Sequence, residues 1–247
     1  MEYNNKNFFD ETSEFYNSMI DSEAAIDRRV KLFSKLKIQD GFVADLGCGS
    51  GIDSIALNKC GNTVEAFDPS PQMIALAERT VAERGLSINF YNYPIEDIPN
   101  QFNEKYSFIC SLGNTIANID SNNLIRAFQK IKKVIKPNGR ALIHILNYNL
   151  LLSKRERIVN ITENDETTFI RFYDFIDDHI VFNILKFAKE DTRRHKLIST
   201  KLFPHTFEVI STVLSKTNFS DLDFYGNFNF EMFDPTKSKD LLISVTK

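Results

Sequence analysis

The stretch VADLGCGSGIDSIAL, residues 43–57, constrains the fold of this chain more than any other part of the sequence. It joins an apolar run to an amphipathic segment through a glycine-rich loop, which is the pattern of a strand, a tight turn and a helix. Glycines cluster in such loops because backbone N–H groups approach a ligand closely only where side chains are absent. Gly47, Gly49 and Gly51 provide this access. The segment therefore predicts an α/β fold with a ligand-binding loop after its first strand.

Short apolar runs alternate with amphipathic stretches from residue 42 to residue 146. This alternation is typical of strand–helix–strand units that build a mostly parallel sheet. The strands predicted in this part are residues 42–46, 62–68, 88–91, 106–111 and 140–146.

The helices between these strands are marked by their end signals. Ser70 is placed to cap a helix, Pro71 suits its first position and Gly85 suits its left-handed stop. A second apolar stripe at helical spacing covers residues 124–135, and Pro137 ends it. We expect the apolar stripes of both helices to face the core.

The pattern changes after residue 146, where aromatic and β-branched runs replace the strand–helix alternation. Beyond residue 203 the chain returns to the α/β pattern, with a helix that Thr206 is expected to cap. Because the segments on either side belong to one sheet, we interpret residues 148–203 as an insertion. The strands predicted here are residues 167–175, 179–187 and 195–203 in the insertion and residues 221–226 and 241–245 at the end of the chain.

These elements predict an α/β fold with a Rossmann-like, doubly wound, seven-stranded, mostly parallel sheet and a small antiparallel β insertion after the fifth strand. A chain of 247 residues allows one sizeable core with such an addition. The predicted parts are an N-terminal helical cap at residues 1–40, a cofactor-binding core at 41–147 and 204–247, and the insertion at 148–203, as a substrate lid or a dimer contact.

Composition limits the function classes. The net charge of −3 gives no long-range attraction to phosphate backbones, so nucleic acid is an unfavoured partner. Cys48, Cys60 and Cys110 form no metal-ligand spacing, so we expect no metal, and an odd number of cysteines fits a reducing compartment. The chain has no apolar run long enough to cross a bilayer and no signal peptide at its start, MEYNNKNFFDE. We therefore expect a cytoplasmic protein without membrane contact.

The loop departs from the dinucleotide fingerprint GxGxxG, because Ile52 follows Gly51. Asp45 would repel a pyrophosphate, but it can hold an ammonium group. Asp68 lies at the tip of the second strand, where a carboxylate can accept both ribose hydroxyls. The acidic pair of residues 95–97 follows the third strand, where a side chain can read an adenine amino group. The implied ligand has an ammonium group, a ribose and an adenine, but no phosphate.

With these features the chain resembles the class I S-adenosylmethionine-dependent methyltransferases. In that family DLGCGSG is the loop for the methionine part of the cofactor, the acid of the second strand binds ribose, and acids after the third strand flank adenine. The resemblance implies methyl transfer by in-line displacement, with S-adenosylhomocysteine as the second product. The implied cofactor site consists of Asp45, Gly47, Cys48, Gly49, Gly51, Asp68, Pro69, Met73, Glu96, Asp97, Ser111 and Leu112.

Three short segments, GSGIDSIAL, SLGNTIANI and ILNYN, are similar to the glycine and sarcosine N-methyltransferases and their small-molecule relatives. The similarity implies a substrate site at Asn114, Asn147 and Tyr148, with Tyr16 as a pocket residue of the N-terminal element. An arginine precedes the Asn-Tyr pair in the glycine enzymes, where it binds the substrate carboxylate. This chain has Leu146 there, so we expect a small-molecule acceptor other than glycine, methylated on an N or O atom.

The aromatic residues of the insertion leave two interpretations open. They line the acceptor pocket as a roof, or they pack the small sheet against the core or against a second copy in a homodimer. The aromatic residues concerned are Phe169, Phe172, Tyr173, Phe182 and Phe187.

The candidates for a catalytic role are Asn114, Tyr148 and His205, of which the histidine is placed beside a pocket edge. The basic run QKIKKVIKPNGR leaves an RNA methyltransferase as an alternative, although lysines at the end of a helix are typical of a solvated face. A second alternative is a scaffold that binds S-adenosylhomocysteine without turnover.

Overall fold

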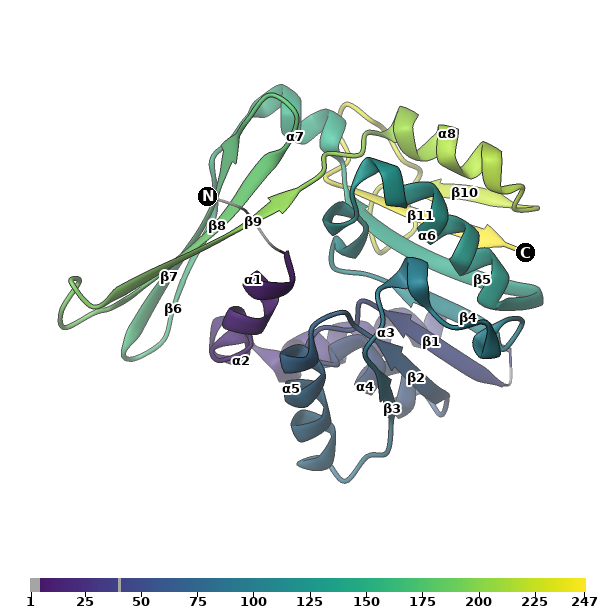
Figure 1. Cartoon of the computed structure of the whole chain (residues 1–247), viewed down its shortest axis with the longest axis horizontal. Helices are drawn as coiled ribbons and strands as arrows, with labels where there is room; N and C mark the ends of the chain where they lie inside the picture. Colours follow the sequence, from purple (N-terminus) through teal and green to yellow (C-terminus); the bar gives the residue numbers. More distant parts are fainter. Residues whose placement is uncertain (1–4, 40) are drawn as a thin grey trace.

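The computed structural model describes residues 5–39 and 41–247, so the first four residues of the predicted cap and its last residue lie outside the described part. Its centre is a seven-stranded sheet (Figure 1) with the order β10-β11-β5-β4-β1-β2-β3. The strands β1 to β5 pair in parallel, whereas β11 is antiparallel to both β5 and β10. This confirms the predicted fold class. The strands are β1 Phe42–Leu46, β2 Thr63–Phe67, β3 Asn89–Tyr91, β4 Tyr106–Ser111, β5 Ile135–Leu146, β10 Leu222–Tyr225 and β11 Asp240–Thr246.

Helices cover both faces of this sheet and create two hydrophobic cores. Successive residues of β4 point to opposite faces, so Ile109 belongs to one core and Cys110 to the other. The helices α3 Ser22–Lys35, α4 Ile52–Lys59 and α5 Pro71–Ala82 contribute to the core of Cys110. The helices α6 Ser121–Val134 and α8 Phe207–Thr217 contribute to the core of Ile109, which also includes residues of the 3-10 turns η1 Ile95–Asp97, η2 Asn100–Phe102 and η3 Thr115–Asn118.

The ends of α5 agree with the sequence signals, while the end of α6 does not. Ser70 Oγ accepts the amide of Met73 at 3.0 Å, and Gly85 adopts φ +63°. The apolar stripe of α6 was expected to include Ile135, but this residue begins β5 and pairs with Tyr106. Proline and glycine in this segment therefore mark an irregular register within β5 instead of a loop before it.

The helix α8 begins after Thr206 as predicted, but the expected capping hydrogen bond is absent. Thr206 occupies the N-cap position, but its side chain makes no capping hydrogen bond. The amide of Phe207 donates instead to Asn149 Oδ1 at 2.9 Å. Asn149 belongs to α7 Tyr148–Lys154, so a residue distant in sequence accepts one of the free amides at the start of α8.

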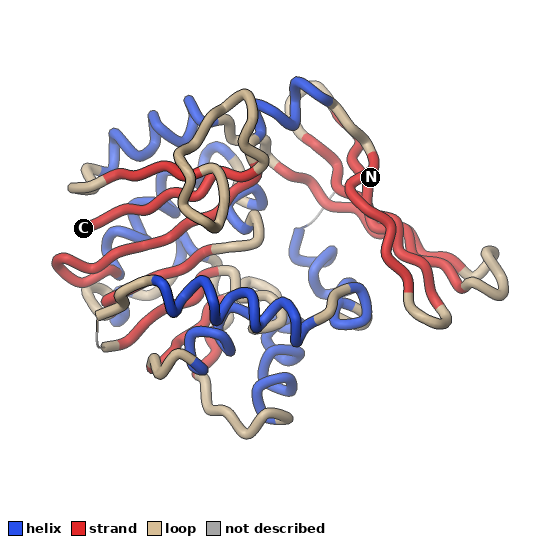
Figure 2. Tube along the Cα trace, turned by 180° about the vertical axis from the view of Figure 1, so that it is seen from behind, coloured by secondary structure: helices blue, strands red, loops and turns tan. Residues whose placement is uncertain are grey.

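A second, antiparallel sheet, called sheet B below, follows α7 and extends away from the seven-stranded sheet (Figures 1 and 2). Three of its strands were predicted, but β6 was not. Ile158 and Val159 of β6 are consecutive apolar residues, and both are exposed. The strand therefore lacks the alternation of apolar and polar residues that identifies a half-buried strand. The strands are β6 Ile158–Glu163, β7 Thr167–Phe175, β8 Ile180–Ala188 and β9 His195–Leu202.

Two short N-terminal helices, α1 Asn5–Thr12 and α2 Tyr16–Met19, lie between sheet B and the core (Figure 1). The Phe15 ring stacks on Phe169 of β7 with the ring centroids 5.7 Å apart. On the core side, Ser70 Oγ donates to Asp10 Oδ1 at 2.6 Å. The N-terminal helices therefore link sheet B to the loop after β2. None of the helices in the described residues is long and apolar enough to span a membrane.

Candidate functional site

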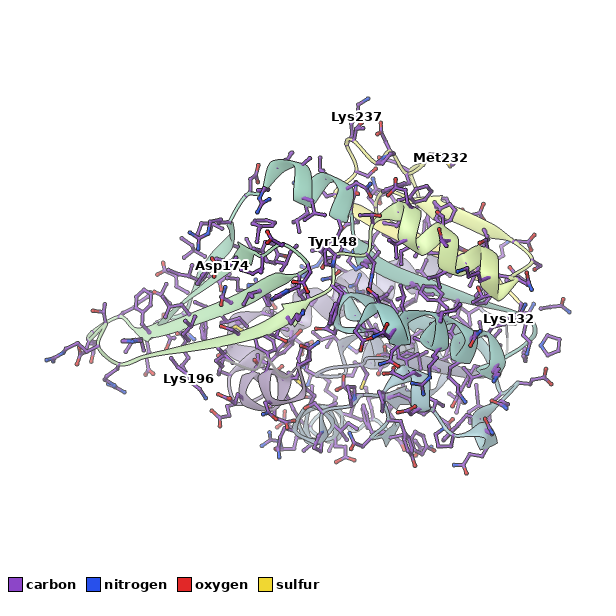
Figure 3. The ribbon with its side chains drawn as sticks, turned by 45° about the horizontal axis from the view of Figure 1, so that its top comes forward. Lys132, Tyr148, Asp174, Lys196, Met232 and Lys237 are labelled. Carbon is purple, nitrogen blue, oxygen red and sulfur yellow. The ribbon has the colours of Figure 1, made fainter. Side chains whose placement is uncertain are left out.

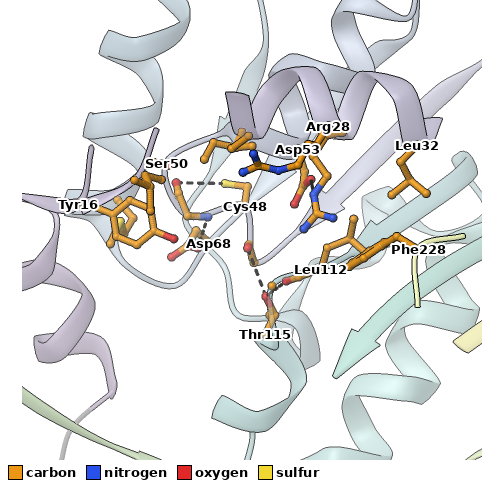
Figure 4. Close-up of a pocket in the computed structure, with 18 of the residues that line it drawn as sticks. Tyr16, Arg28, Leu32, Cys48, Ser50, Asp53, Asp68, Leu112, Thr115 and Phe228 are labelled. Carbon is orange, nitrogen blue, oxygen red and sulfur yellow. Dashed lines mark hydrogen bonds and ion pairs between the residues drawn. The ribbon is translucent and has the colours of Figure 1, made fainter. Parts of the chain in front are cut away.

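A cavity of about 720 Å³ opens at the carboxyl ends of β1 and β2, where open α/β sheets bind their ligands (Figure 4). Figure 4 shows Tyr16, Ser50 and Asp68 toward one end and Arg28, Leu32 and Phe228 toward the other. The lining includes eight residues of the predicted site, namely Tyr16, Gly47, Cys48, Gly49, Asp68, Pro69, Met73 and Leu112.

The glycine loop forms the floor of this cavity. Gly47 adopts φ +75°, and a Cβ atom there would lie 2.2 Å from Thr115 Cγ2, so no larger residue fits. Gly51 adopts φ +84° and lies close to Ala77 of α5. A Cβ atom on Gly49 would meet nothing within 4 Å. Gly47 and Gly51 are therefore required by packing and backbone conformation, and Gly49 leaves open space where a ligand can approach the backbone.

Asp68 forms part of the cavity wall directly after β2. Its Oδ2 accepts the amide of Gly49 and its Oδ1 accepts the amide of Ser70, each at 2.9 Å. Burial raises the pKa of Asp68 to about 6, although these two hydrogen bonds act in the opposite direction. The carboxylate is held in one orientation by the glycine loop and by the start of α5, and it retains lone pairs that can accept hydroxyl groups.

Asp45 lies beneath the glycine loop and is not among the residues that line the cavity. Its Oδ2 accepts the Ser54 hydroxyl at 2.6 Å, and the Cys110 thiol donates to its Oδ1 at 3.5 Å. Burial and the neighbouring carboxylates raise the pKa of Asp45 to about 7, against the effect of these hydrogen bonds. In this arrangement Asp45 fixes β1 to α4 and β4.

The cavity wall contains an ion pair that was not predicted from the sequence. Arg29 Nε lies 2.7 Å from Asp53 Oδ1, and Arg28 lines the cavity beside this pair. Both arginines come from α3, which was predicted only as part of a helical cap. Asp53 was visible within GSGIDS, but nothing in that motif showed that an arginine from α3 would face it. The cavity thus has positive and negative groups together at the end that Arg28 lines.

The two acids after β3 are not brought to the cavity. Asp97 Oδ1 accepts from Arg126 at 3.0 Å, and both side chains are more than half exposed. Glu96 is turned inward, and its buried Oε2 has no hydrogen-bond partner within the described residues. Burial raises the pKa of Glu96. Of these two acids, Glu96 has the free acceptor atom that an amino group would satisfy.

The loop after β4 is fixed by Asn114, which has φ +68°. Its amide donates to His144 Nδ1 at 3.2 Å, its Oδ1 accepts the amide of Leu146 at 3.0 Å, and its Nδ2 donates to the Tyr148 hydroxyl at 3.0 Å. Asn114 therefore joins β4, β5 and α7. Its neighbours Leu112, Gly113 and Thr115 line the cavity, while Asn114 itself does not.

Four more of the predicted residues, Ser111, Asn147, Tyr148 and His205, do not line the cavity. Ser111 is buried, and its Oγ has no partner among the described residues. Asn147 caps α7 and donates to the carbonyls of Pro235 and Ser238. Tyr148 is buried where the chain leaves the seven-stranded sheet (Figure 3). His205 Nε2 lies 2.8 Å from the carbonyl of Ile119, and burial lowers the pKa of this histidine.

None of the five aromatic residues singled out in the insertion is among the cavity-lining residues. Phe169 and Phe182 pack against the N-terminal helices, and Tyr173 packs into the main core. Phe172 and Phe187 lie on the opposite face of sheet B, because side chains alternate along a strand. Within the described residues, no group of histidine, cysteine or acidic side chains is arranged to hold a metal ion.

Comparison with known proteins agrees with this geometry. A family model described as a methyltransferase domain matches residues 43–139. A ubiquinone biosynthesis O-methyltransferase from Pseudomonas savastanoi pv. phaseolicola is 31% identical over 124 residues, which are 50% of this chain and 50% of that protein. The chain therefore matches about half the length of its curated relatives.

Solved structures share the fold over nearly the whole chain. The CcbJ methyltransferase from Streptomyces caelestis is similar with a TM-score of 0.81 at 13% identity, over 98% of each chain. The sugar N-methyltransferase KedS8 from Streptoalloteichus sp ATCC 53650 is similar with a TM-score of 0.67 at 15% identity, over 100% of this chain and 94% of that chain. Residues 43–139 are thus a methyltransferase domain, and the chain has the fold of the S-adenosylmethionine-dependent methyltransferases.

Proposed function

We propose that this protein transfers a methyl group from S-adenosylmethionine to an N or O atom of a small molecule. The observation that carries the proposal is the cavity of about 720 Å³ above the glycine loop, which the N-terminal helices partly enclose. Tyr16 and Ile20 form part of its wall, so the site is a pocket instead of an open groove. Such a pocket suits a small acceptor better than a folded polymer.

The residues of the cavity fit the cofactor in three ways. Asp68 offers carboxylate oxygens to the ribose hydroxyls, and the open space above Gly49 admits the ligand next to the backbone. Arg28 supplies a positive charge for the carboxylate of the methionine part, and Asp53 a negative charge for its ammonium group. Glu96 has a buried oxygen without a hydrogen-bond partner among the described residues, but it does not line the cavity, so we assign it no contact with the cofactor.

When bound, the cofactor supplies an electrophilic methyl group on a sulfonium centre. The chain's task is then to hold the acceptor's lone pair in line with that carbon and to exclude water. Asn114 makes the loop after β4 rigid through its three hydrogen bonds, and Tyr148 is held at the end of this network. We assign both a positioning role. Neither His144, bonded to Asn114 and Asp240, nor the buried His205 lines the cavity, so we assign no general base.

The names of two similar proteins support an N or O atom as the methyl acceptor. One is named an O-methyltransferase of ubiquinone biosynthesis and the other a sugar N-methyltransferase. The basic run QKIKKVIKPNGR, which suggested the RNA alternative, gives it little support in the structure. Lys132 of that run donates to the carbonyls at the end of α8, and Lys130 to Asn100, so these ammonium groups are engaged within the fold.

The test is incubation of the pure protein with S-adenosylmethionine labelled in its methyl group and a deproteinised cell extract, followed by separation into small-molecule and RNA pools. We expect label in the small-molecule pool, loss of label with Asp68→Ala, and unchanged label with Glu163→Gln, which alters an exposed acid of β6. Label in RNA alone would replace the proposal with the RNA alternative. Cofactor binding without any label transfer would favour the scaffold.

A further inference from the structure

One arginine lies on the face of sheet B that is turned toward the N-terminal helices. Side chains alternate along β7, so Phe169, Arg171 and Tyr173 share this face. Phe169 stacks on Phe15, and Tyr173 packs into the main core. Arg171 is therefore held between two anchored aromatic residues on the inner face of the sheet.

The guanidinium group of Arg171 keeps most of its hydrogen-bonding capacity. Its Nε donates to Asn160 Oδ1 of the neighbouring strand at 2.6 Å, which fixes the direction of the side chain. No carboxylate of the described residues lies within ion-pair distance of it, and its two terminal nitrogens have no hydrogen-bond partner among those residues. A half-buried cation without a counter-charge is unfavourable, and a guanidinium is suited to binding a carboxylate or phosphate with two parallel hydrogen bonds.

Arg171 does not itself line the cofactor cavity, but it acts on a residue that does. Tyr16 lines the cavity, and its neighbour Phe15 is stacked on Phe169, two residues before Arg171. Burial raises the pKa of Tyr16, and the positive charge of Arg171 is the strongest influence in the opposite direction. The guanidinium is therefore within Coulombic range of a hydroxyl group in the cavity wall.

On its other side, Arg171 is connected with the loop after β4. Burial raises the pKa of Tyr148, the charge of Tyr173 adds to this rise, and the Tyr148 hydroxyl accepts from Asn114 Nδ2. Arg171 thus occupies the middle of a series of polar groups that runs from the cofactor cavity to the end of β5. At that end of β5 the chain carries Leu146, which offers no charge to a substrate.

We propose that Arg171 binds an anionic group of the methyl acceptor, a carboxylate or a phosphate, and thereby determines which small molecules are methylated. This inference rests on the proposed function. The other cations near the site have different surroundings. Arg29 is paired with Asp53, and Lys186 of sheet B lies with its Nζ 4.7 Å from the ring centroid of Phe15. Arg28, Lys31 and Lys35 of α3 line the cofactor cavity itself, where we assign Arg28 to the cofactor.

The first test uses the labelled small-molecule pool. We expect the labelled product to be retained by an anion-exchange column at pH 8. If phosphatase treatment abolishes this retention, the group is a phosphate, and if not, it is a carboxylate. Identification of the labelled product also identifies the acceptor. For this acceptor, Arg171→Gln is expected to raise the apparent KM by about 10-fold to 100-fold, because a charge-assisted hydrogen bond is lost. Lys186→Gln, a change of charge on the same face, should leave KM within about twofold.

Two further measurements separate a binding role from a structural one. The affinity for S-adenosylmethionine and the midpoint of thermal unfolding should be the same in Arg171→Gln and the wild type, and Arg171→Lys should recover part of the lost KM. A labelled product without negative charge, or an unchanged KM in Arg171→Gln, would overturn the inference while leaving the proposed function intact.

Anion binding by Arg171 can also be tested when the methyl acceptor has not been identified. Inorganic phosphate is titrated into the protein saturated with S-adenosylhomocysteine, and binding is followed by NMR. We expect millimolar binding to the wild type and to Lys186→Gln, and binding at least 10-fold weaker to Arg171→Gln. Equal binding in all three, or none in the wild type, would overturn the assignment of Arg171. Absence of label from the small-molecule pool in the earlier experiment would instead contradict the proposed function.

Discussion

At the scale of single residues, two acids at strand ends have different surroundings and therefore different roles. Asp68 is fixed by two backbone amides and lines the cavity, whereas Asp45 is bonded to Ser54 and Cys110 beneath the loop. Both are buried, and burial raises the pKa of both. The sequence predicted both acids at strand ends, but it did not show which of the two would line the cavity.

The pKa of Asp68, about 6, predicts the pH dependence of cofactor binding. In the proposed contact both oxygens of the carboxylate accept ribose hydroxyls, which requires the ionised form, so the affinity for S-adenosylhomocysteine should be constant above pH 7 and fall as the pH drops below 6. Calorimetric titrations between pH 5 and pH 8 would measure this. Asp68→Asn should weaken binding about 10-fold at pH 8 and remove this part of the pH dependence. A wild-type affinity that does not change with pH would contradict the assignment.

The pKa of Asp45, about 7, predicts a change in stability. Between pH 4 and pH 7 the folded state keeps a proton that the unfolded state has lost, so the free energy of unfolding falls as the pH rises through this range. Asp45→Asn keeps an acceptor for Ser54 and removes this titration. Urea unfolding of the variant should therefore show a smaller loss of stability from pH 5 to pH 8 than that of the wild type. Equal pH dependence in both proteins would contradict the burial of this acid.

At the scale of elements, the glycine loop joins β1 to α4 and depends on contacts with η3. Gly47→Ala would bring a Cβ atom to 2.2 Å from Thr115 Cγ2 at φ +75°, so we expect a loss of about 2–4 kcal/mol in stability together with loss of cofactor binding. Gly85→Ala is the matched control, because it has φ +63° but nothing within 4 Å. It should cost about 1 kcal/mol and leave binding unchanged. Chemical unfolding and calorimetry would distinguish the two variants, and equal effects would show that the contact with Thr115 is unimportant.

Local patterns predicted the elements well where one face is buried. The aromatic run of β7 was predicted with its observed bounds, Thr167–Phe175, and α5 with its cap and stop. The strand β6 was missed because its apolar residues are exposed. The start of α8 at Thr206 was predicted, but the sequence did not show that Asn149 would accept the amide of Phe207 there. Contacts of this kind depend on the tertiary fold and leave no periodic signal in the sequence.

The same limit applies to the site. The glycine loop and Asp68 were identified because they follow strands at fixed spacing. Arg28 and Phe228 were not, since they come from distant parts of the chain and meet only in the folded protein (Figure 4). Sequence motifs therefore identified the cofactor side of the cavity better than the walls that surround it.

At the scale of the whole molecule, sheet B is attached to the core through the N-terminal helices. Phe8, Phe15 and Met19 of the N-terminal segment form a hydrophobic cluster with Phe169 on the inner face of sheet B. Phe169→Ala should destabilise this attachment by about 3 kcal/mol and increase amide hydrogen exchange in α1 and α2, but not in β4. Phe172→Ala, on the outer face of the same strand, should cost less than about 1 kcal/mol. Unchanged exchange in α1 and α2 of Phe169→Ala would contradict the proposed attachment.

The most direct test of the central claim is a calorimetric titration of the wild-type protein with S-adenosylmethionine, S-adenosylhomocysteine and NAD. The glycine loop, Asp68 and the arginines of α3 line the cavity, and we propose that they bind a ligand with a ribose and an amino-acid group but no pyrophosphate. We therefore expect one molecule of S-adenosylmethionine or S-adenosylhomocysteine to bind per chain and no heat from NAD. Binding of NAD without binding of either sulfur compound would contradict the account.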